Sequence, residues 1–292
     1  MAPEVNFLST ITGSFAHPAA ENPTIAMIQA AYAHHSIDAQ YLNCDVGSDD
    51  LADAVRGARA MGWLGFNCSL PHKVAVIGHL DRLARSASII RAVNCVVARD
   101  GALVGENTDG VGFLDALRTV ADPRGARVVL LGAGGAARAI AVELALAGAA
   151  HITIVNRSTE RAAALAEILT EVPTVAVQTS DWPSAVPYRL PPDTQVLVNA
   201  TSIGLFPDVS ARPDVDPDSL RSATVVADVI PNPPHTPFLD VARRAGCVTL
   251  DGLGMLVNQG RVAVELWTGL RPDADVMRSA LLQALSLNPS ES

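Results

Sequence analysis

The sequence predicts an α/β protein with two domains, one of them built on a doubly wound parallel sheet. Three observations support this prediction: the chain has 292 residues, 49% of them are apolar, and helix and strand patterns alternate along most of it. Because domains often contain about 150 residues, a chain of this length favours two of them. The apolar residues suffice for a sizeable core, which excludes a disordered chain.

The clearest pattern lies at residues 127–158, which read as a strand, a glycine turn, a helix and a second strand. Val128–Leu131 has the composition of a buried strand, and Ala136–Ala147 places apolar residues at helical spacing before Gly148. His151–Val155 forms the second strand. This βαβ unit predicts two parallel strands joined by a right-handed crossover.

The alternation continues on both sides of this unit. The segment upstream has no glycine turn of the same kind, so we predict a separate α/β domain there. Residues 183–192 and 208–218 are rich in proline or aspartate and predict surface loops, whereas the pattern from residue 253 onward is helical. The other expected elements are helices at Thr24–His34, Asp49–Met61, Thr159–Thr170 and Phe238–Ala245, and strands at Ala39–Leu42, Thr174–Val177, Gln195–Asn199, Thr224–Asp228 and Val248–Leu250.

Charge and hydropathy exclude several classes of partner. The formal net charge is −9 and no basic block occurs, so we expect no binding to nucleic acid or to an anionic membrane surface. The longest apolar stretch, Ala139–Ala150, contains Glu143 and is shorter than the roughly 20 residues that a membrane-spanning helix needs. No basic residue precedes an apolar segment at the start of the sequence, which favours a cytoplasmic location.

The cysteines and histidines show no metal-binding pattern. The seven histidines lack metal-ligand spacing, and the four cysteines form no C-x-x-C pair. We therefore expect no bound metal and no disulfide framework. The cysteines, expected to be reduced and mostly buried, are Cys44, Cys68, Cys95 and Cys247.

The glycine turn after the first strand of the βαβ unit matches the pattern G-x-G-x-x-G/A. Gly132 permits a tight turn, Gly134 lets the backbone approach a pyrophosphate, and Ala137 lets the helix pack closely. A turn that serves packing alone is the alternative, but the flanking strands and helix favour a Rossmann-type dinucleotide site. The expected cofactor contacts in the turn are Gly132, Ala133, Gly134, Gly135 and Ala136.

The end of the second strand indicates which dinucleotide binds. An NAD enzyme usually has an acidic residue there, whereas this chain has Asn156, Arg157 and Ser158, followed by Arg161. Because two guanidinium groups can bind a 2′-phosphate and Ser158 adds a hydroxyl, we expect NADP in preference to NAD. The alternative is that both arginines are solvated cations on the helix surface.

One cation differs from all the others. Of the 21 Lys and Arg residues, Lys73 is the single lysine. A genome biased toward arginine codons would explain this ratio. A catalytic role would explain it as well, because an ammonium group can donate a proton whereas a guanidinium group stays protonated.

Three segments concentrate polar residues that neither a core nor a loop requires. They read GFNCSLPHK at 65–73, AVNC at 92–95 and ENTDG at 106–110. They resemble the G-x-N-V-T-x-P-x-K, A-V-N-T and N-T-D-G-x-G-F signatures of shikimate dehydrogenases. NATSIG at 199–204 and GLGMLVNQ at 252–259 also resemble segments of that family, so the resemblance covers about residues 60–270.

The resemblance implies a substrate domain of residues 1–115 completed by helices in 254–292, an NADP domain of residues 116–253, and an active site in the cleft between them. It also implies the reversible oxidation of a ring hydroxyl to a ketone, as in shikimate to 3-dehydroshikimate with NADP. Lys73 and Asp109 are then the catalytic pair. A lysine beside a carboxylate can move the hydroxyl proton while hydride leaves, although the sequence leaves open which group is the formal base.

The resemblance assigns further residues to the site. Four positions correspond to substrate contacts, with a serine in place of the family's usual threonine: Asn67, Ser69, Asn94 and Gln259. Four more correspond to cofactor contacts: Thr201, Val229, Gly252 and Met255.

Each polar residue also has a purely structural interpretation. Asn67 and Asn94 can satisfy backbone groups in turns, and Asp109 can cap a helix that begins near Gly110. His72 is expected to line the site at most, because its side chain would point away from Lys73 in an extended segment.

Two departures from the family pattern affect the carboxylate end of the substrate. The family has G-x-P-x-x-H-S-x-S-P near its N-terminus, and its two serines bind the substrate carboxylate. Aligned on Pro23, this chain has Ala20 and Asn22 at the serine positions, with Glu21 between them. Pro231 stands where the family commonly has a tyrosine. Losing two hydrogen bonds of ~1.5–3 kcal/mol each would weaken shikimate binding roughly 10²- to 10⁴-fold.

Three functions remain open on this basis. The first is NADP-dependent interconversion of shikimate and 3-dehydroshikimate, or of a close analogue. The second is a related enzyme acting on quinate, an amino analogue or another cyclic alcohol, including an uncharged one. The third is a non-catalytic NADP-binding regulator, which would need neither Lys73 nor Asp109. The expected partner is a small cyclic hydroxy acid or alcohol, bound by a monomer or a homodimer.

Overall fold

The computed structural model describes residues 8–183 and 185–286. Two segments used above lie partly outside these ranges. One is the N-terminal segment from which a secretion signal was judged, and the other is the end of the predicted 254–292 segment. The chain forms two compact units. Unit 1 is drawn from Met1–Ala87, Arg91–Glu106 and Gly260–Ser292, and unit 2 from Ser88–Ile90 and Asn107–Gln259.

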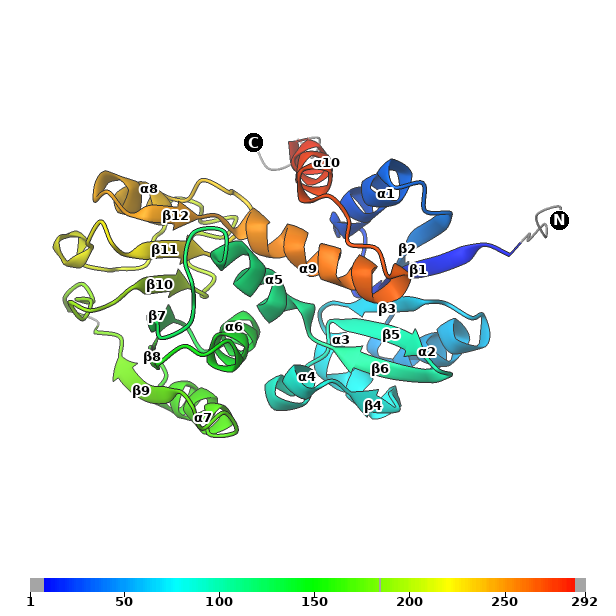
Figure 1. The fold of residues 1–292 in the computed structure, drawn as a ribbon, viewed down its shortest axis with the longest axis horizontal. Helices are drawn as coiled ribbons and strands as arrows, with labels where there is room; N and C mark the ends of the chain where they lie inside the picture. Colours follow the sequence, from blue (N-terminus) through cyan, green and yellow to red (C-terminus); the bar gives the residue numbers. More distant parts are fainter. Residues whose placement is uncertain (1–7, 184, 287–292) are drawn as a thin grey trace. The chain divides into compact units, whose positions relative to one another are not determined.

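Unit 2 contains a six-stranded sheet in the order β12-β11-β10-β7-β8-β9, in which every pairing is parallel (Figure 1). Numbered from β7, this is the order 3-2-1-4-5-6 of a doubly wound dinucleotide fold. The predicted Rossmann-type sheet is therefore confirmed. Its strands are β7 (Arg127–Leu131), β8 (His151–Asn156), β9 (Ala176–Asp181), β10 (Val196–Asn199), β11 (Val225–Asp228) and β12 (Val248–Leu250).

Both faces of this sheet are covered, which explains why its central strands read as unbroken apolar runs. Val129 and Leu131 of β7 belong to a core cluster that includes Phe238 and Leu239, whereas Val128 and Leu130 are buried as well. The helices of unit 2 are α5 (Thr108–Leu117), α6 (Gly135–Leu146), α7 (Thr159–Leu169), α8 (Pro237–Arg244) and the first part of α9 (Gly252–Thr268).

The first unit boundary lies at Asn107, before α5, whereas the sequence placed it at 116. Helix α5 belongs to unit 2 because it packs on α6. A Cβ at Gly110 would stand only 2.3 Å from the carbonyl oxygen of Ala139, so the two helices approach as closely as a glycine allows. The second boundary lies inside α9, at Gly260 instead of 254.

Unit 1 has a mixed sheet in the order β2-β1-β3-β5-β6-β4. β1 pairs with β2 and β3 in parallel, whereas β5 is antiparallel to both β3 and β6. The predicted strand near Ala39 is present, whereas the other strands of this sheet were not predicted from the sequence. The strands are β1 (Thr10–Ala16), β2 (Ala39–Asp45), β3 (Gly65–Cys68), β4 (Arg82–Leu83), β5 (Cys95–Arg99) and β6 (Ala102–Glu106).

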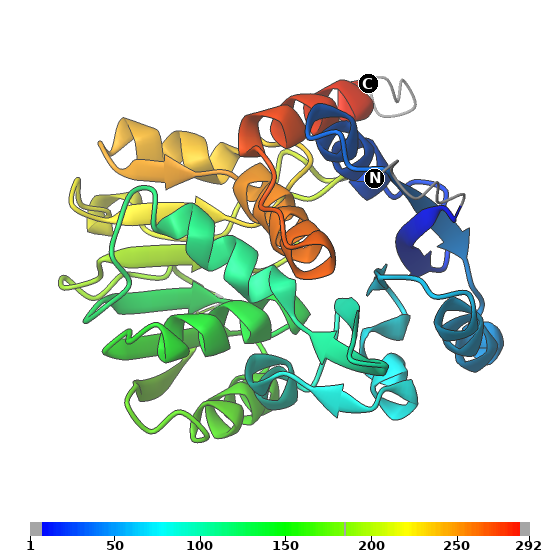
Figure 2. The same ribbon diagram turned by 45° about the vertical axis from the view of Figure 1, so that its right-hand side comes forward.

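The helices of unit 1 enclose an aromatic core. Phe15 on β1 packs on Phe66 with ring centroids 4.4 Å apart, in a cluster that also includes residues of α2. α10 contacts α1, and Figure 2 shows the two helices beside each other. The helices are α1 (Thr24–His34), α2 (Leu51–Ala60), α3 (His72–Ala75), α4 (Arg85–Ile90, which enters unit 2), the second part of α9, and α10 (Ala274–Ser286). Short 3-10 turns lie at Ser48–Asp50, Val76–His79 and Pro217–Ser219.

Within the described ranges, no helix combines the length and the apolar character needed to cross a bilayer. All four cysteines are free thiols, and Cys68, Cys95 and Cys247 are buried.

Candidate active site

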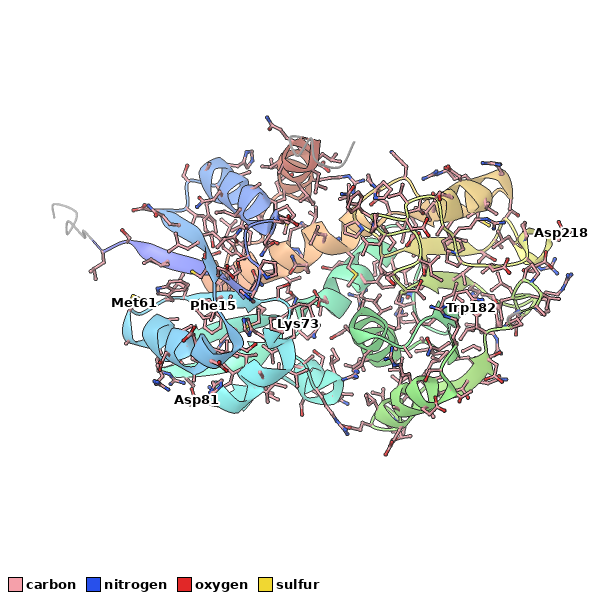
Figure 3. All side chains as sticks on the ribbon, turned by 180° about the vertical axis from the view of Figure 1, so that it is seen from behind. Phe15, Met61, Lys73, Asp81, Trp182 and Asp218 are labelled. Atoms are coloured by element: carbon pink, nitrogen blue, oxygen red, sulfur yellow. The ribbon has the colours of Figure 1, made fainter. Side chains whose placement is uncertain are left out.

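In unit 1, the segment that carries Lys73 docks on the Ala92–Cys95 segment. The carbonyl oxygen of Lys73 accepts the Val93 amide hydrogen bond at 2.7 Å, and the Asn94 carbonyl accepts the Cys68 amide at 2.9 Å. Two of the three motifs singled out in the sequence are thus joined through their main chains. Lys73 itself is half-buried at the start of the short helix α3, and Figure 3 labels it.

The thiol of Cys68 is buried close enough to Lys73 to feel its charge. Burial raises the pKa of the Cys68 thiol to about 12, and the nearby Lys73 charge opposes this rise. The segment is helical from His72 onward rather than extended, so the premise of the sequence argument about His72 was wrong. Its imidazole is buried and its Nε2 lies 2.7 Å from the Val46 carbonyl oxygen, which makes it a support for the turn.

Asn67 has the structural role that was considered as the alternative. Its Oδ1 accepts a hydrogen bond from the Tyr41 hydroxyl at 2.9 Å, and its Nδ2 donates to the Asn94 carbonyl at 3.1 Å. Both residues are buried, with Tyr41 fully so. Asn67 therefore fixes the position of the Asn94 turn. Its contact with the substrate stays a prediction, as do those of Asn94 and the half-buried Ser69.

Replacing Tyr41 by Phe tests this support. We expect the free energy of unfolding to fall by about 1–3 kcal/mol, because the buried Asn67 oxygen loses its donor. Urea unfolding followed by circular dichroism measures the change. Tyr32→Phe is the control, since it also removes a buried hydroxyl, but one that lies 2.8 Å from Thr12 Oγ1 on β1 instead of bonding Asn67 on β3. A Tyr41→Phe loss accompanied by an unchanged KM would show that Asn67 acts on stability alone.

The N-terminal segment of unit 1 forms an uncharged amide network where the family places its serines. Ser14 is buried and donates to Asn43 Oδ1 at 2.9 Å, while Asn22 Nδ2 donates to Ser14 at 3.4 Å. Asn43 Nδ2 in turn donates to the Asn22 carbonyl at 2.9 Å. Residues 13–23 and 39–45 contain no Lys or Arg, so this described segment offers no side-chain guanidinium or ammonium group to a carboxylate.

In unit 2, Asp109 lies in the first turn of α5. The sequence allowed Asp109 to be the helix cap, but that interpretation is wrong: Asn107 is the N-cap, and its Oδ1 accepts the Asp109 amide at 3.2 Å. Thr108 is buried, and its hydroxyl donates to Gln259 Oε1 at 3.5 Å. Asn107 and Thr108, which we had not selected, thus position Asp109 and Gln259.

A cavity of about 120 Å³ joins several of the predicted residues within unit 2. Asp109 and Gln259 line it together with three residues expected to contact the cofactor, and Pro231 lines it where the family has a tyrosine. Its lining is Asp109, Val229, Pro231, Gly252, Met255, Leu256 and Gln259. Apolar walls around one carboxylate are the setting in which a polar reaction is shielded from water.

The glycine turn after β7 fits a dinucleotide. Gly132 has φ +108°, and a Cβ there would lie 2.8 Å from the Ala200 carbonyl oxygen, so only glycine suits the position. At Gly134 and Gly135 an added Cβ would meet nothing within 4 Å. Among the described residues no side chain caps the N-terminus of α6, which leaves amide groups available to a pyrophosphate.

A cavity of about 260 Å³ adjoins this turn. Arg161 lines it with Arg138, which we had not selected although it follows the glycine turn directly. The lining residues are Ala133, Gly134, Gly135, Arg138, Arg161, Ala164 and Leu165. Two guanidinium groups beside free amides suit a pyrophosphate, so the residues present fit NADP.

The residues after β8 have more specific roles than the sequence indicated. Asn156 Nδ2 donates to the Ser158 carbonyl at 2.9 Å. Ser158 caps α7 by accepting the Arg161 amide at 3.2 Å, and its hydroxyl donates to Glu160 at 2.7 Å. Arg157 lines a different cavity from Arg161. The two arginines that the sequence grouped together therefore face separate spaces.

The turn that holds Thr201 is fixed by a buried polar network. Asn199 Oδ1 accepts hydrogen bonds from the Thr201 amide and hydroxyl at 3.1 and 2.7 Å, and Asn199 Nδ2 donates to Asp228 at 2.9 Å. Asp228 also accepts from Thr236, and burial raises the pKa of its carboxyl. Because this turn packs on Gly132, the network positions one wall of the glycine turn.

Three family models match the chain. They are a shikimate dehydrogenase substrate binding domain at residues 15–96, a shikimate/quinate 5-dehydrogenase domain at 115–202 and a shikimate 5′-dehydrogenase C-terminal domain at 252–282.

No group of His, Cys, Asp or Glu among the described residues is arranged to hold a metal ion.

The similarity to known proteins covers almost the whole chain. The shikimate dehydrogenase (NADP(+)) of Methanopyrus kandleri is 42% identical over 279 residues, covering 95% of this chain and 96% of that protein. The ligand-free 5-ketofructose reductase of Gluconobacter sp. strain CHM43 is 57% identical, with a TM-score of 0.91 and coverage of 95% and 99%. The shikimate 5-dehydrogenase of Thermus thermophilus, in complex with NADP(H) and shikimate, is 32% identical, with a TM-score of 0.80 and coverage of 94% and 99%.

Proposed function

The chain belongs to the shikimate dehydrogenase family and is an NADP-dependent oxidoreductase, and we propose that its preferred substrate is an uncharged polyhydroxy ketone of the 5-ketofructose kind. The observation that carries this proposal is the replacement of the carboxylate-binding serines. Ala20 and Asn22 stand at those positions, and Asn22 is tied into the neutral network with Ser14 and Asn43.

An amide network suits hydroxyl groups better than a carboxylate. Asn and Ser side chains both donate and accept hydrogen bonds, as sugar hydroxyls do. A carboxylate would find no Lys or Arg side chain to pair with in residues 13–23 and 39–45. The same preference follows in unit 2, where Pro231 has no hydroxyl to offer the substrate.

Sequence identity supports the same substrate class. The Gluconobacter 5-ketofructose reductase is 57% identical to this chain, whereas the shikimate dehydrogenase of Methanopyrus kandleri is 42% identical. An enzyme of this class reduces a ketone to an alcohol without contacting a carboxylate. That chemistry needs the lysine and aspartate of the family and does not need its serine pair.

Lys73 and Asp109 carry the proton transfer in this proposal. When bound, NADPH supplies the hydride that the carbonyl carbon accepts. The Lys73 ammonium group donates a proton to the carbonyl oxygen as negative charge develops there, and the alcohol is formed. The Asp109 carboxylate orients the substrate hydroxyl. Gln259 and Asn94 hydrogen-bond the remaining hydroxyls.

The second candidate is the interconversion of shikimate and 3-dehydroshikimate. It is favoured by the names of the curated relatives and by the intact segments around Lys73, Asn94 and Asp109. Both candidates share cofactor, catalytic pair and reaction type. They differ only in whether the substrate bears a carboxylate.

Initial rates of NADPH oxidation distinguish these substrates. We expect kcat/KM for 5-ketofructose to exceed that for 3-dehydroshikimate by roughly 10²- to 10⁴-fold, since two hydrogen bonds to a charged group are missing. The matched variant is Ala20→Ser with Asn22→Ser and Pro231→Tyr, which should raise the 3-dehydroshikimate rate and lower the 5-ketofructose rate. Equal or reversed efficiencies in the unaltered protein would refute the proposal. Cofactor binding without turnover of any ketone would favour a regulator.

A further inference from the structure

The last residues of α4 belong to unit 2, although the chain on both sides of them belongs to unit 1. They are Ser88–Ile90, which stand between Ala87 and Arg91 of unit 1. Ile89 and Ile90 are both buried. The end of α4 is therefore packed within unit 2, and nothing in the site described so far gives it a role.

Arg138 makes a hydrogen bond to this end of α4. It lies in the first turn of α6, and its Nη1 donates to the Ile90 carbonyl oxygen at 3.2 Å. Ile90 is the last residue of α4, and the last carbonyl groups of a helix have no partner within the helix. A guanidinium group at this position therefore stabilises the helix end, as a cation does near a helix C-terminus.

The same Arg138 side chain lines the cavity beside the glycine turn, where a pyrophosphate fits. A guanidinium group has five N–H donors in one rigid plane. One donor can hold the Ile90 carbonyl while others bind a phosphate oxygen. Arg138 is thus placed to contact the cofactor and the end of α4 at the same time.

A short stretch of chain connects Ile90 to the segment that supports Lys73. Arg91 has a left-handed backbone with φ +56°, which ends the helix. Three residues beyond Ile90, the buried Val93 amide donates to the Lys73 carbonyl at 2.7 Å. Three residues span at most about 11 Å, which is too short for a flexible loop. A restraint on the Ile90 carbonyl therefore also restrains the segment around Val93.

We propose that Arg138 is a positioning residue that couples cofactor binding to the segments of Lys73 and Asn94. Its guanidinium group forms charge-assisted hydrogen bonds with a phosphate bound beside it, which restricts the motion of the side chain. The Ile90 carbonyl is then held more firmly, and with it the Val93 amide that supports Lys73. Because coupling between two sites is reciprocal, bound substrate strengthens cofactor binding in turn. This coupling does not depend on which ketone is reduced.

Hydrogen–deuterium exchange of the full chain tests the coupling without any turnover. In the unaltered protein we expect saturating NADP to slow amide exchange in a peptide of residues 88–98 by about 5- to 50-fold. In Arg138→Met, at an NADP concentration that again saturates the protein, the slowing should be less than about twofold. Equal slowing in the two proteins, or none in the unaltered protein, would overturn the proposal.

Arg161→Met is the matched control. Arg161 lines the same cavity as Arg138, but the hydrogen bond of its main-chain amide leads to Ser158 of its own helix cap. We expect this variant to raise the dissociation constant for NADP about 10-fold and to keep the slowing of exchange once NADP saturates it. Loss of the slowing in both variants alike would show that the coupling does not run through the contact between Arg138 and Ile90.

The Michaelis constant gives a second readout. At saturating NADPH, Arg138→Met should raise KM for the ketone that the enzyme turns over by about 5- to 50-fold, whereas Arg161→Met should leave this KM within about twofold. A thermal melt establishes that both variants are folded. An equal KM in the two variants would contradict the positioning role of Arg138.

Discussion

Replacing Lys73 by Met is expected to lower kcat for ketone reduction by about 10³- to 10⁴-fold, because the reacting oxygen loses its proton donor. The fold should survive, since the main-chain carbonyl of Lys73, and not its side chain, accepts the Val93 hydrogen bond. Stopped-flow measurement of NADPH oxidation, together with a thermal melt, gives both quantities. Turnover within tenfold of the original in a folded protein would contradict the assignment.

Two further variants separate charge from proton transfer. Lys73→Arg keeps the positive charge but not the ability to release a proton, so we expect substrate binding to remain while kcat stays low.

Asp109→Asn should lower kcat by about 10²- to 10³-fold. Asp115→Asn is its control on the same helix, because Asp115 lies 3.6 Å from Arg118 and does not line the cavity that Asp109 lines. A loss in Asp115→Asn as large as that in Asp109→Asn would point to a general effect on α5.

Replacing Gly132 by Ala is expected to lower the free energy of unfolding by about 2–5 kcal/mol. The position has φ +108°, and the new methyl group would meet the Ala200 carbonyl oxygen at 2.8 Å, which is backbone and cannot move cheaply. Chemical denaturation measures this loss. NADP affinity should fall as well, because the shift displaces the turn that carries Thr201.

Gly134→Ala is the matched control within the same turn. An added Cβ there meets nothing within 4 Å, so we expect the free energy of unfolding to change by less than about 1 kcal/mol. NADP affinity should nevertheless fall at least about tenfold, since the methyl group occupies the space that a pyrophosphate needs. Equal destabilisation by Gly134→Ala and Gly132→Ala would show that the two glycines do not have these separate roles.

The fold of unit 2 was predictable because its signals are local. The run from Val128 to Leu131, the glycine turn and the following helix lie within one βαβ unit, and the order of the sheet agrees with it. The strand expected at Thr174–Val177 instead occupies Ala176–Asp181. Most residues of β9 are exposed, and its polar residues QTSD therefore lack the apolar pattern by which a buried strand is recognised.

Unit 1 was harder to predict because its sheet is assembled from distant segments. β3 is only Gly65–Cys68, and its register with β1 and β5 is set by pairing rather than by its own sequence. The roles of its polar residues depended on the same pairing. Asn67 becomes a structural residue only because β2 brings the Tyr41 hydroxyl to it.

Residues whose role depends on tertiary packing were the ones missed. Arg138 lies in α6 just after the glycine turn, and the cavity that it lines forms only where α7 packs beside that turn. Asn107 was part of a motif, but its capping of α5 became visible only when the bounds of the helix were known.

The half-buried Lys73 is the single lysine of the chain. Amine-directed reagents therefore encounter one side-chain target in the whole molecule, and that target is the group assigned to proton transfer. A fluorophore or an isotope label attached by acylation would therefore report from this one side chain, besides the α-amino group of the chain.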